Sequence, residues 1–358
     1  MLKAAHDVAA KQALFRLATN SSRRSNDASQ LHGVFAVNKP PGISCAGLLD
    51  YFKRNITRGP DSMSFDEHFQ REKELRDESA LSKTKKARRR FVPSNIRVGH
   101  GGTLDVEAAG VLVFGINNGC KQLGEYLVGG KSYLATGRLG VATESYDAEG
   151  KVTRVCCHSA TKQVTAAMIA EAIPRFVGDI MQRPPIYSAI KLDGKRLYEY
   201  ARTGEQVPVE IKTRKVKVDD IKLLYYENQE AGERLGTQVV LPQAVADYYA
   251  SGIYEWRGEG ASGDPVVGQP LLPFANQPLA PKFQLLVSSG GGVYVRSLIH
   301  DLGEAVGSAA TMVSLVRTSQ GFLRLDRDTI EPEDLAYMDR VKEAMHHAES
   351  VVSTLRHQ

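Results

Sequence analysis

The stretch Val98–Gly115 reads V-G-H-G-G-T-L-D-V-E-A-A-G-V-L-V-F-G and decides how the rest of the chain is interpreted. Glycines at 99, 101 and 102 precede one carboxylate, Asp105, and an apolar run follows at Val111–Phe114. Glycine lets a backbone turn through positive φ and approach a ligand closely, and a short apolar run is typical of a buried strand. A carboxylate between two such segments must be paired, hydrogen-bonded or functional. The alternative is an aspartate that only caps a turn or a helix.

The composition is that of a globular protein. Its 358 residues are 42% hydrophobic and 24% charged, enough for one large domain or two smaller ones. A net charge of +5 permits a polyanionic partner without demonstrating one. Four cysteines form no C-x-x-C pair and no Cys/His metal spacing, so we predict reduced thiols in a soluble intracellular protein and no metal site. No apolar run approaches the roughly 18 residues of a membrane-spanning helix, so membrane insertion is not expected.

Two basic segments lie outside the expected core. Residues 1–30 are basic and acid-poor, which is typical of a mitochondrial presequence; a disordered N-terminal extension is an equal alternative. Within 57–95, Asp66–Glu78 alternates acids and bases and predicts an exposed helix or disorder. Lys83–Arg90 places six cations in eight residues. That run can bind RNA phosphates, serve as a nuclear import signal, or be only a solvated basic run.

The run G-H-G-G-T-L-D, with G-V-L after it, resembles the catalytic signature of the TruB family of pseudouridine synthases. Further motifs follow the order of that family between His32 and Phe322, and several motifs in one order are far more specific than one. They are N-K-P-P-G (38–42) after a predicted strand and before a helix capped by Ser44, K-S-Y (131–133), T-E-S-Y-D-A-E-G (143–150), K-L-D-G-K-R-L-Y-E-Y-A-R (191–202), G-V-Y-V-R-S-L-I-H-D-L-G (292–303) and L-V-R-T-S-Q-G (315–321).

The resemblance implies an α+β pseudouridine synthase fold: a mixed, mostly antiparallel sheet with flanking helices and a central catalytic cleft. Asp105 matches the central catalytic group, Arg296 the arginine that pairs with it, and Tyr133 the tyrosine that stacks on the target base. Such a pair makes physical sense, because a guanidinium keeps a buried carboxylate ionised and oriented. Taken alone, Tyr133 would be interpreted as strand packing and Arg296 as a surface cation. The RNA contacts implied by the resemblance are Lys39, His100, Lys191, Arg202, Tyr294 and Arg317.

His100 matches the residue that fills the space left in the RNA by a flipped base, whereas Lys39 alone would be interpreted as a solvated charge at a strand end. The implied reaction isomerises the T-loop uridine at position 55 of tRNA after base flipping, without a metal or an organic cofactor. Three routes stay open for the carboxylate: attack on C1′, attack on C6, or removal of the C2′ proton. The 191–202 motif favours a stand-alone monomer that acts without a guide RNA on the T-arm of tRNA, with some mRNAs as further candidate substrates. The nucleus, the mitochondrion or both are the expected locations.

We predict a catalytic domain over 31–325, with insertions at about 57–95 and 227–280, and a helical tail over 326–358 in place of a full C-terminal RNA-binding domain. The chain departs from the family pattern after Asp105, because Val106 replaces the usual proline and Glu107-Ala108-Ala109 replaces Leu-Ala-Ser. A non-catalytic tRNA-binding chaperone is the main alternative. A phosphohydrolase with an aspartyl intermediate would need an acid just upstream of Gly102-Thr103, and positions 96–102 contain none.

Overall fold

The computed structural model describes residues 31–59, 63–81, 96–192, 194–203, 208, 210–239 and 280–356. The predictions for residues 1–30, for Lys83–Arg90 and for most of the segment 227–280 lie outside these ranges. No helix in the described ranges is long and apolar enough to cross a membrane.

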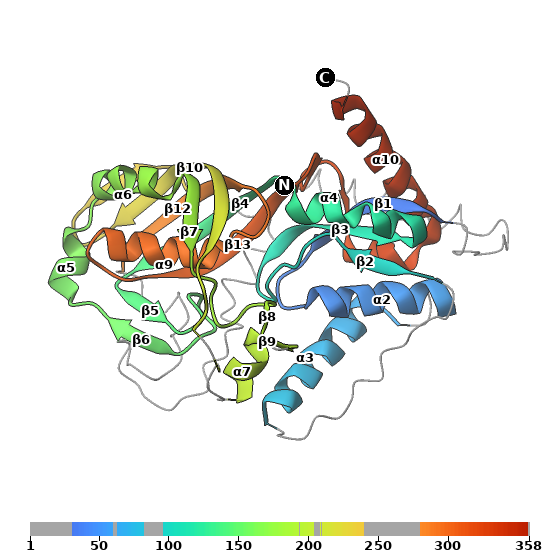
Figure 1. Ribbon diagram of the computed structural model, residues 1–358, viewed down its shortest axis with the longest axis horizontal. Helices are drawn as coiled ribbons and strands as arrows, with labels where there is room; N and C mark the ends of the chain where they lie inside the picture. The colour runs from blue at the N-terminus through green and yellow to red at the C-terminus, as the bar shows by residue number, and fades with distance from the viewer. Residues whose placement is uncertain are drawn as a thin grey trace, which may run out of the picture.

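A mixed sheet runs through the whole width of the described molecule (Figure 1). Its order is β11-β10-β12-β4-β13-β3-β1-β15, with β7 added to β10, β2 to β3 and β14 to β13. The β1–β15 and β3–β13 pairs are parallel and the other pairs are antiparallel. The strands are β1 Gly33–Lys39, β2 Val98–His100, β3 Ala109–Ile116, β4 Lys131–Leu139, β7 Gly178–Gln182, β10 Arg214–Asn228, β11 Glu233–Gly236, β12 Lys282–Ser289, β13 Ala310–Gln320, β14 Leu323–Arg324 and β15 Thr329–Ile330.

Helices cover this sheet and confirm the predicted α+β class (Figure 1). They are α2 Cys45–Arg58, α3 Phe65–Leu81, α4 Leu123–Val128, α5 His158–Gln163, α6 Ala166–Ala172, α7 Leu197–Thr203, α9 Val295–Ala305 and α10 Met338–Arg356, with 3-10 turns at Asn117–Lys121, Ile173–Phe176 and Pro332–Ala336. Two small hairpins complete the fold, β5 Val141–Thr143 with β6 Val152–Val155, and β8 Lys191–Leu192 with β9 Lys195–Arg196.

The centre of the sheet is as apolar as the sequence predicts. All eight residues of β3 are buried, including the run Val111–Phe114. Rings of Phe35, Phe52 and Phe114 meet with centroids 5.5–5.9 Å apart and join β1, α2 and β3. Burying each such side chain stabilises the fold by about 1.5–3 kcal/mol. Phe114 of this cluster pairs with His100, so the packing supports the end of β2.

The predicted elements near this centre are present, with shifted boundaries. Ser44 caps α2 by accepting a hydrogen bond of 2.9 Å from the Gly47 N–H, as predicted. The segment Asp66–Glu78 lies within α3, and the buried Phe65 and His68 fasten that helix to the core. The C-terminal helix α10 starts at Met338, because a 3-10 turn at Pro332–Ala336 precedes it.

Candidate active site

Residues 101–108 join β2 to β3 and are called the Asp105 loop below. The Gly101 N–H donates to the carbonyl of Val113 at 2.9 Å, so the loop folds back on the strand that follows it. Gly102 and Gly110 have φ values of 144° and 104°, which glycine alone adopts readily. At Gly110 a Cβ would also overlap the carbonyl oxygen of Arg317 on the parallel strand β13. The signature glycines therefore serve the close packing of the backbone around Asp105.

The side chain of Asp105 forms an ion pair with Arg296 in the first turn of α9. Arg296 Nη2 donates to Asp105 Oδ1 at 3.1 Å, and Nε lies 2.9 Å from Oδ2. The Nε–H does not point well enough for a hydrogen bond, so this second approach is a contact between charges. The arginine side chain is 4% exposed and the aspartate side chain is 38% exposed. A carboxylate held on one side and open on the other can act on a bound molecule.

A second carboxylate, Asp147, faces the same guanidinium. Arg296 Nη1 lies 3.0 Å from Asp147 Oδ2 and also donates to the Ser145 carbonyl at 3.1 Å. Burial raises the pKa of Asp147 to about 6, against the opposing effect of Arg296. Burial disfavours the charged form of Arg296 too, yet Asp105 and Asp147 together raise its pKa above the ordinary value. The guanidinium is therefore a permanent cation between two carboxylates.

Two aromatic side chains of the predicted site lie on β2 and β4, which are separated in the sheet by β3 and β13. His100 ends β2 and is half-buried; burial, and next the charge of Arg317, lower its pKa, so the ring is neutral at pH 7. Tyr133 on β4 lies opposite Arg317 on β13 and is 7% exposed. Burial raises the pKa of the Tyr133 hydroxyl, against the effect of the neighbouring guanidinium. The hydroxyl therefore keeps its proton near neutral pH.

Comparison with known proteins shows the family of the chain. A family model described as "TruB family pseudouridylate synthase (N terminal domain)" matches residues 88–239. The chain is 32% identical to "tRNA pseudouridine synthase 4" of Schizosaccharomyces pombe, over 82% of this chain and 80% of that protein. The chain belongs to the TruB family. It is also 32% identical to "Pseudouridylate synthase TRUB1" of Homo sapiens, over 90% of this chain and 70% of that TruB protein.

Solved structures similar to this TruB chain include "Structure of H/ACA RNP bound to a substrate RNA containing 2'-deoxyuridine". The likeness has a TM-score of 0.44 and 19% identity, and it covers 90% of this chain and 58% of that chain.

Two cations that the TruB resemblance placed among the RNA contacts are buried. Lys39 has no exposed surface, and its ammonium donates to the carbonyls of Pro40, Val106 and Ala108 at 2.6–2.9 Å. Arg317 is 1% exposed and donates to the carbonyls of Val111 at 2.6 Å and Gly102 at 3.2 Å. These donors are used inside the protein, so both residues hold the Asp105 loop in this structure. Direct contact of Lys39 and Arg317 with RNA stays a prediction.

The remaining predicted RNA contacts of this TruB chain stay predictions. Lys191 on β8 is exposed. Arg202 lies in α7, but its side chain is outside the described residues. Tyr294, which precedes α9, is half-buried with its ring 5.2 Å from the Arg214 guanidinium. Gln182 fixes the Tyr294 backbone through a donated bond of 3.0 Å and an accepted bond of 2.8 Å.

Sequence reasoning missed two side chains at the site. Asp147 was noted only as part of the T-E-S-Y-D-A-E-G motif, and that motif was the available signal for its role. Gln320 on β13 donates to the carbonyl of Gly101 at 2.7 Å and accepts from the Val113 N–H at 3.2 Å. It thus ties the start of the Asp105 loop to β3. No sequence pattern marked Gln320, because its partners lie more than 200 residues away in the chain.

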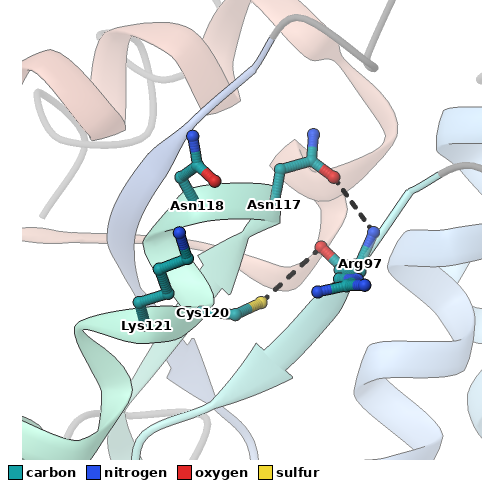
Figure 2. Close-up of a pocket in the computed structure, with 5 residues that line it drawn as sticks. All are labelled: Arg97, Asn117, Asn118, Cys120 and Lys121. Carbon is teal, nitrogen blue, oxygen red and sulfur yellow. Dashed lines mark hydrogen bonds between the residues drawn. The ribbon is translucent and has the colours of Figure 1, made fainter.

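The pocket in Figure 2 lies elsewhere. It has a volume of about 380 Å³ and sits at the end of the β2–β3 pair opposite the Asp105 loop, lined by Arg97, Asn117, Asn118, Cys120 and Lys121. None of the residues around Asp105 lines it. Within the described ranges, no group of three or more His, Cys, Asp or Glu side chains could hold a metal ion.

Proposed function

We propose that this chain is a tRNA pseudouridine synthase that isomerises the T-loop uridine at position 55, with Asp105 as the catalytic group. The observation that carries the proposal is the ion pair of a buried arginine with a carboxylate that keeps 38% of its surface open. The relatives named tRNA pseudouridine synthase 4 support tRNA as the substrate. The T-arm is the part of the tRNA that the enzyme binds.

The target base leaves its stack before it reacts. A stacked base shields C1′, C6 and C5, so the uridine is flipped out at a cost of a few kcal/mol. His100 fills the vacated space, and its depressed pKa suits this role, because a neutral ring stacks among bases without bringing a charge. Tyr133 then holds the uracil ring beside Asp105.

The reaction is an isomerisation and balances without a co-reactant. The bond from N1 to C1′ breaks, the uracil rotates, and a new bond forms from C5 to C1′. C5 loses its proton and N1 ends with one, so no oxidant, reductant or leaving group is required. Asp105 supplies the carboxylate for the breaking step, and Arg296 keeps that carboxylate ionised and aimed. Tyr133 assists removal of the C5 proton by holding the ring in place, because its own hydroxyl keeps its proton.

The enzyme acts as a monomer and without a guide RNA, on tRNA and on those mRNAs that present a similar loop. Phosphates of the T-arm meet Lys191, Arg202 and the face around Tyr294. The enzyme works without a metal or organic cofactor, and it resides in the nucleus, the mitochondrion or both.

A carbodiimide-based pseudouridine readout on a tRNA transcript tests the function. We expect a mark at the T-loop uridine with the wild type and none with Asp105→Asn, while both proteins bind the transcript. A mark that persists with Asp105→Asn would remove Asp105 from the chemistry. Binding by both proteins without any mark would instead support the tRNA-binding chaperone.

A further inference from the structure

A helix from the segment that the sequence marks as an insertion contacts the Asp105 loop. Arg76, near the C-terminal end of α3, places Nη1 3.0 Å from Glu107 Oε1, two residues after Asp105. The two side chains are 31% and 12% exposed, so the pair is partly shielded from water. The same nitrogen lies 3.5 Å from the carbonyl of Gly42, in the turn after β1.

The other end of α3 is fixed to the core, which makes the helix able to support the loop. His68 Nε2 lies at hydrogen-bond distance, 2.8 Å, from the Gly47 carbonyl in α2. The Tyr51 ring on α2 packs against Phe65 and His68 with centroids 5.3 Å apart in both pairs. At its own first residue, α2 touches the Asp105 loop, because Cys45 Sγ accepts from the Leu104 N–H at 3.2 Å.

The loop is thus held on several sides. Lys39 binds two of its carbonyls from β1, the Gly42 N–H donates to Val106 at 2.9 Å, and Arg317 and Gln320 bind it from β13. All of these contacts are made to backbone atoms or to the start of the loop. Arg76 instead contacts a side chain of the loop, that of Glu107, two residues after Asp105.

Charge gives the contact a second effect. Glu149 lies against Glu107, and burial, followed by repulsion from Glu107, raises the pKa of Glu149 well above its usual value, while Arg76 acts in the opposite direction. A cation at position 76 therefore offsets the negative charge that Glu107 adds beside Asp105, and the charge that Glu149 would add on ionising. Without Arg76, the Glu107 carboxylate would turn toward water and draw the loop with it.

We propose that α3 braces the Asp105 loop and that Arg76 is a positioning residue, which acts on Asp105 through Glu107. The inference rests on the proposed function of the site. A partly exposed ion pair of this kind contributes little to overall stability, so its loss should loosen the loop about fivefold rather than unfold the protein.

The test uses the full chain with four single variants and one double variant. Arg76→Met removes the charge at similar length, Arg76→Lys keeps it, and Glu107→Gln removes the partner. Arg71→Met is the matched control, because Arg71 is an exposed cation on the same helix. Hydrogen exchange of the amides 101–108 is measured on each protein, together with single-turnover modification of a tRNA transcript and the affinity for that transcript.

We expect Arg76→Met to speed exchange of the loop amides and to lower the single-turnover rate, each about fivefold, with affinity for the transcript unchanged. Arg76→Lys and Arg71→Met should behave like the wild type. In the Glu107→Gln background, Arg76→Met should cause no further loss, because the pair is already broken.

Unchanged exchange of amides 101–108 in Arg76→Met would overturn the brace. Equal losses of affinity in Arg76→Met and Arg71→Met would also overturn it, since both cations would then act on RNA directly. Exchange does not depend on turnover. An inactive wild type with a loop loosened by Arg76→Met would therefore leave the brace standing and refute the proposed function alone.

Discussion

Arg296 and Asp105 form an ion pair in which the arginine is buried and the aspartate is not. Beyond Asp105, the two terminal nitrogens of the guanidinium donate inside the protein to Asp147, the Ser145 carbonyl and the Tyr187 carbonyl at 2.9–3.1 Å. Its position is thus determined by three segments that are distant in sequence. The open oxygen surface of Asp105 is the part left for a substrate.

Replacing Arg296 by lysine should separate orientation from charge. A lysine ammonium cannot reach all four acceptors that the planar guanidinium of Arg296 binds. Asp105 would therefore keep a nearby cation but lose its fixed orientation. We expect the single-turnover rate to fall by about 100-fold while the affinity for tRNA stays unchanged, as measured by quench-flow and filter binding. A rate within a factor of about two of the wild type would contradict the orienting role.

Asp147 should make the reaction rate fall at acidic pH. Its pKa of about 6 means that the carboxyl gains a proton as the pH falls through 6, and Arg296 then loses one of two counter-charges. We expect the wild-type rate to fall in that range. Asp147→Asn should give a lower rate that does not change with pH near 6. Single-turnover rates over a pH series test this, and an unchanged fall in the variant would assign it to another group.

The same pKa predicts a stability effect of definite sign. Because the folded-state pKa of Asp147 is raised, its stabilising contribution is full below the unfolded pKa of about 3.8 and is lost as the pH rises through about 6. Asp147→Asn cannot ionise, so its free energy of unfolding relative to the wild type should be higher at about pH 7 than at about pH 4. Urea unfolding at the two pH values measures this, and the opposite trend would contradict the assignment.

Lys39→Met should affect stability and turnover rather than RNA binding. The buried ammonium donates to three carbonyls, and methionine removes that donor from each of them, although the Val106 carbonyl keeps its bond from the Gly42 N–H. We expect a loss of about 2–4 kcal/mol in the free energy of unfolding and a slower reaction, with the salt dependence of tRNA binding unchanged. A smaller salt slope with intact stability would support the direct RNA contact.

Lys191→Ala should affect RNA binding rather than stability and turnover. This exposed side chain on β8 has no structural role in the described fold that its loss would disturb. If it neutralises one phosphate, the slope of log affinity against log salt concentration should fall by about 0.7–0.9, with the rate at saturation unchanged. Lys222→Ala, on the exposed face of β10, is the control, since it removes an equal charge elsewhere. Equal effects of both substitutions would indicate only a general charge effect.

Local elements around the site were predictable because their causes are local. Ser44 as an N-cap, the strand β1 ending at Pro40-Pro41-Gly42 and the buried run Val111–Phe114 each follow from side-chain chemistry within a few residues. Helix α3 was predicted only as an exposed helix or disorder. Two buried side chains, Phe65 and His68, decide its position, and a helix that is mostly polar gives little sign of them.

The sequence by itself determined the family pattern, the core strands and the residues Asp105 and Arg296. It could do so because glycine turns, apolar runs and motif order can be recognised from the order of the residues alone. The tertiary structure alone decided that Asp147 shares Arg296, that Lys39 and Arg317 face inward, and that Arg76 meets Glu107. Each of these depends on burial and on contacts across 31 to 215 residues of sequence. A charged side chain looks the same in sequence whether it faces solvent or carbonyl oxygens, and only its packing determines which it does.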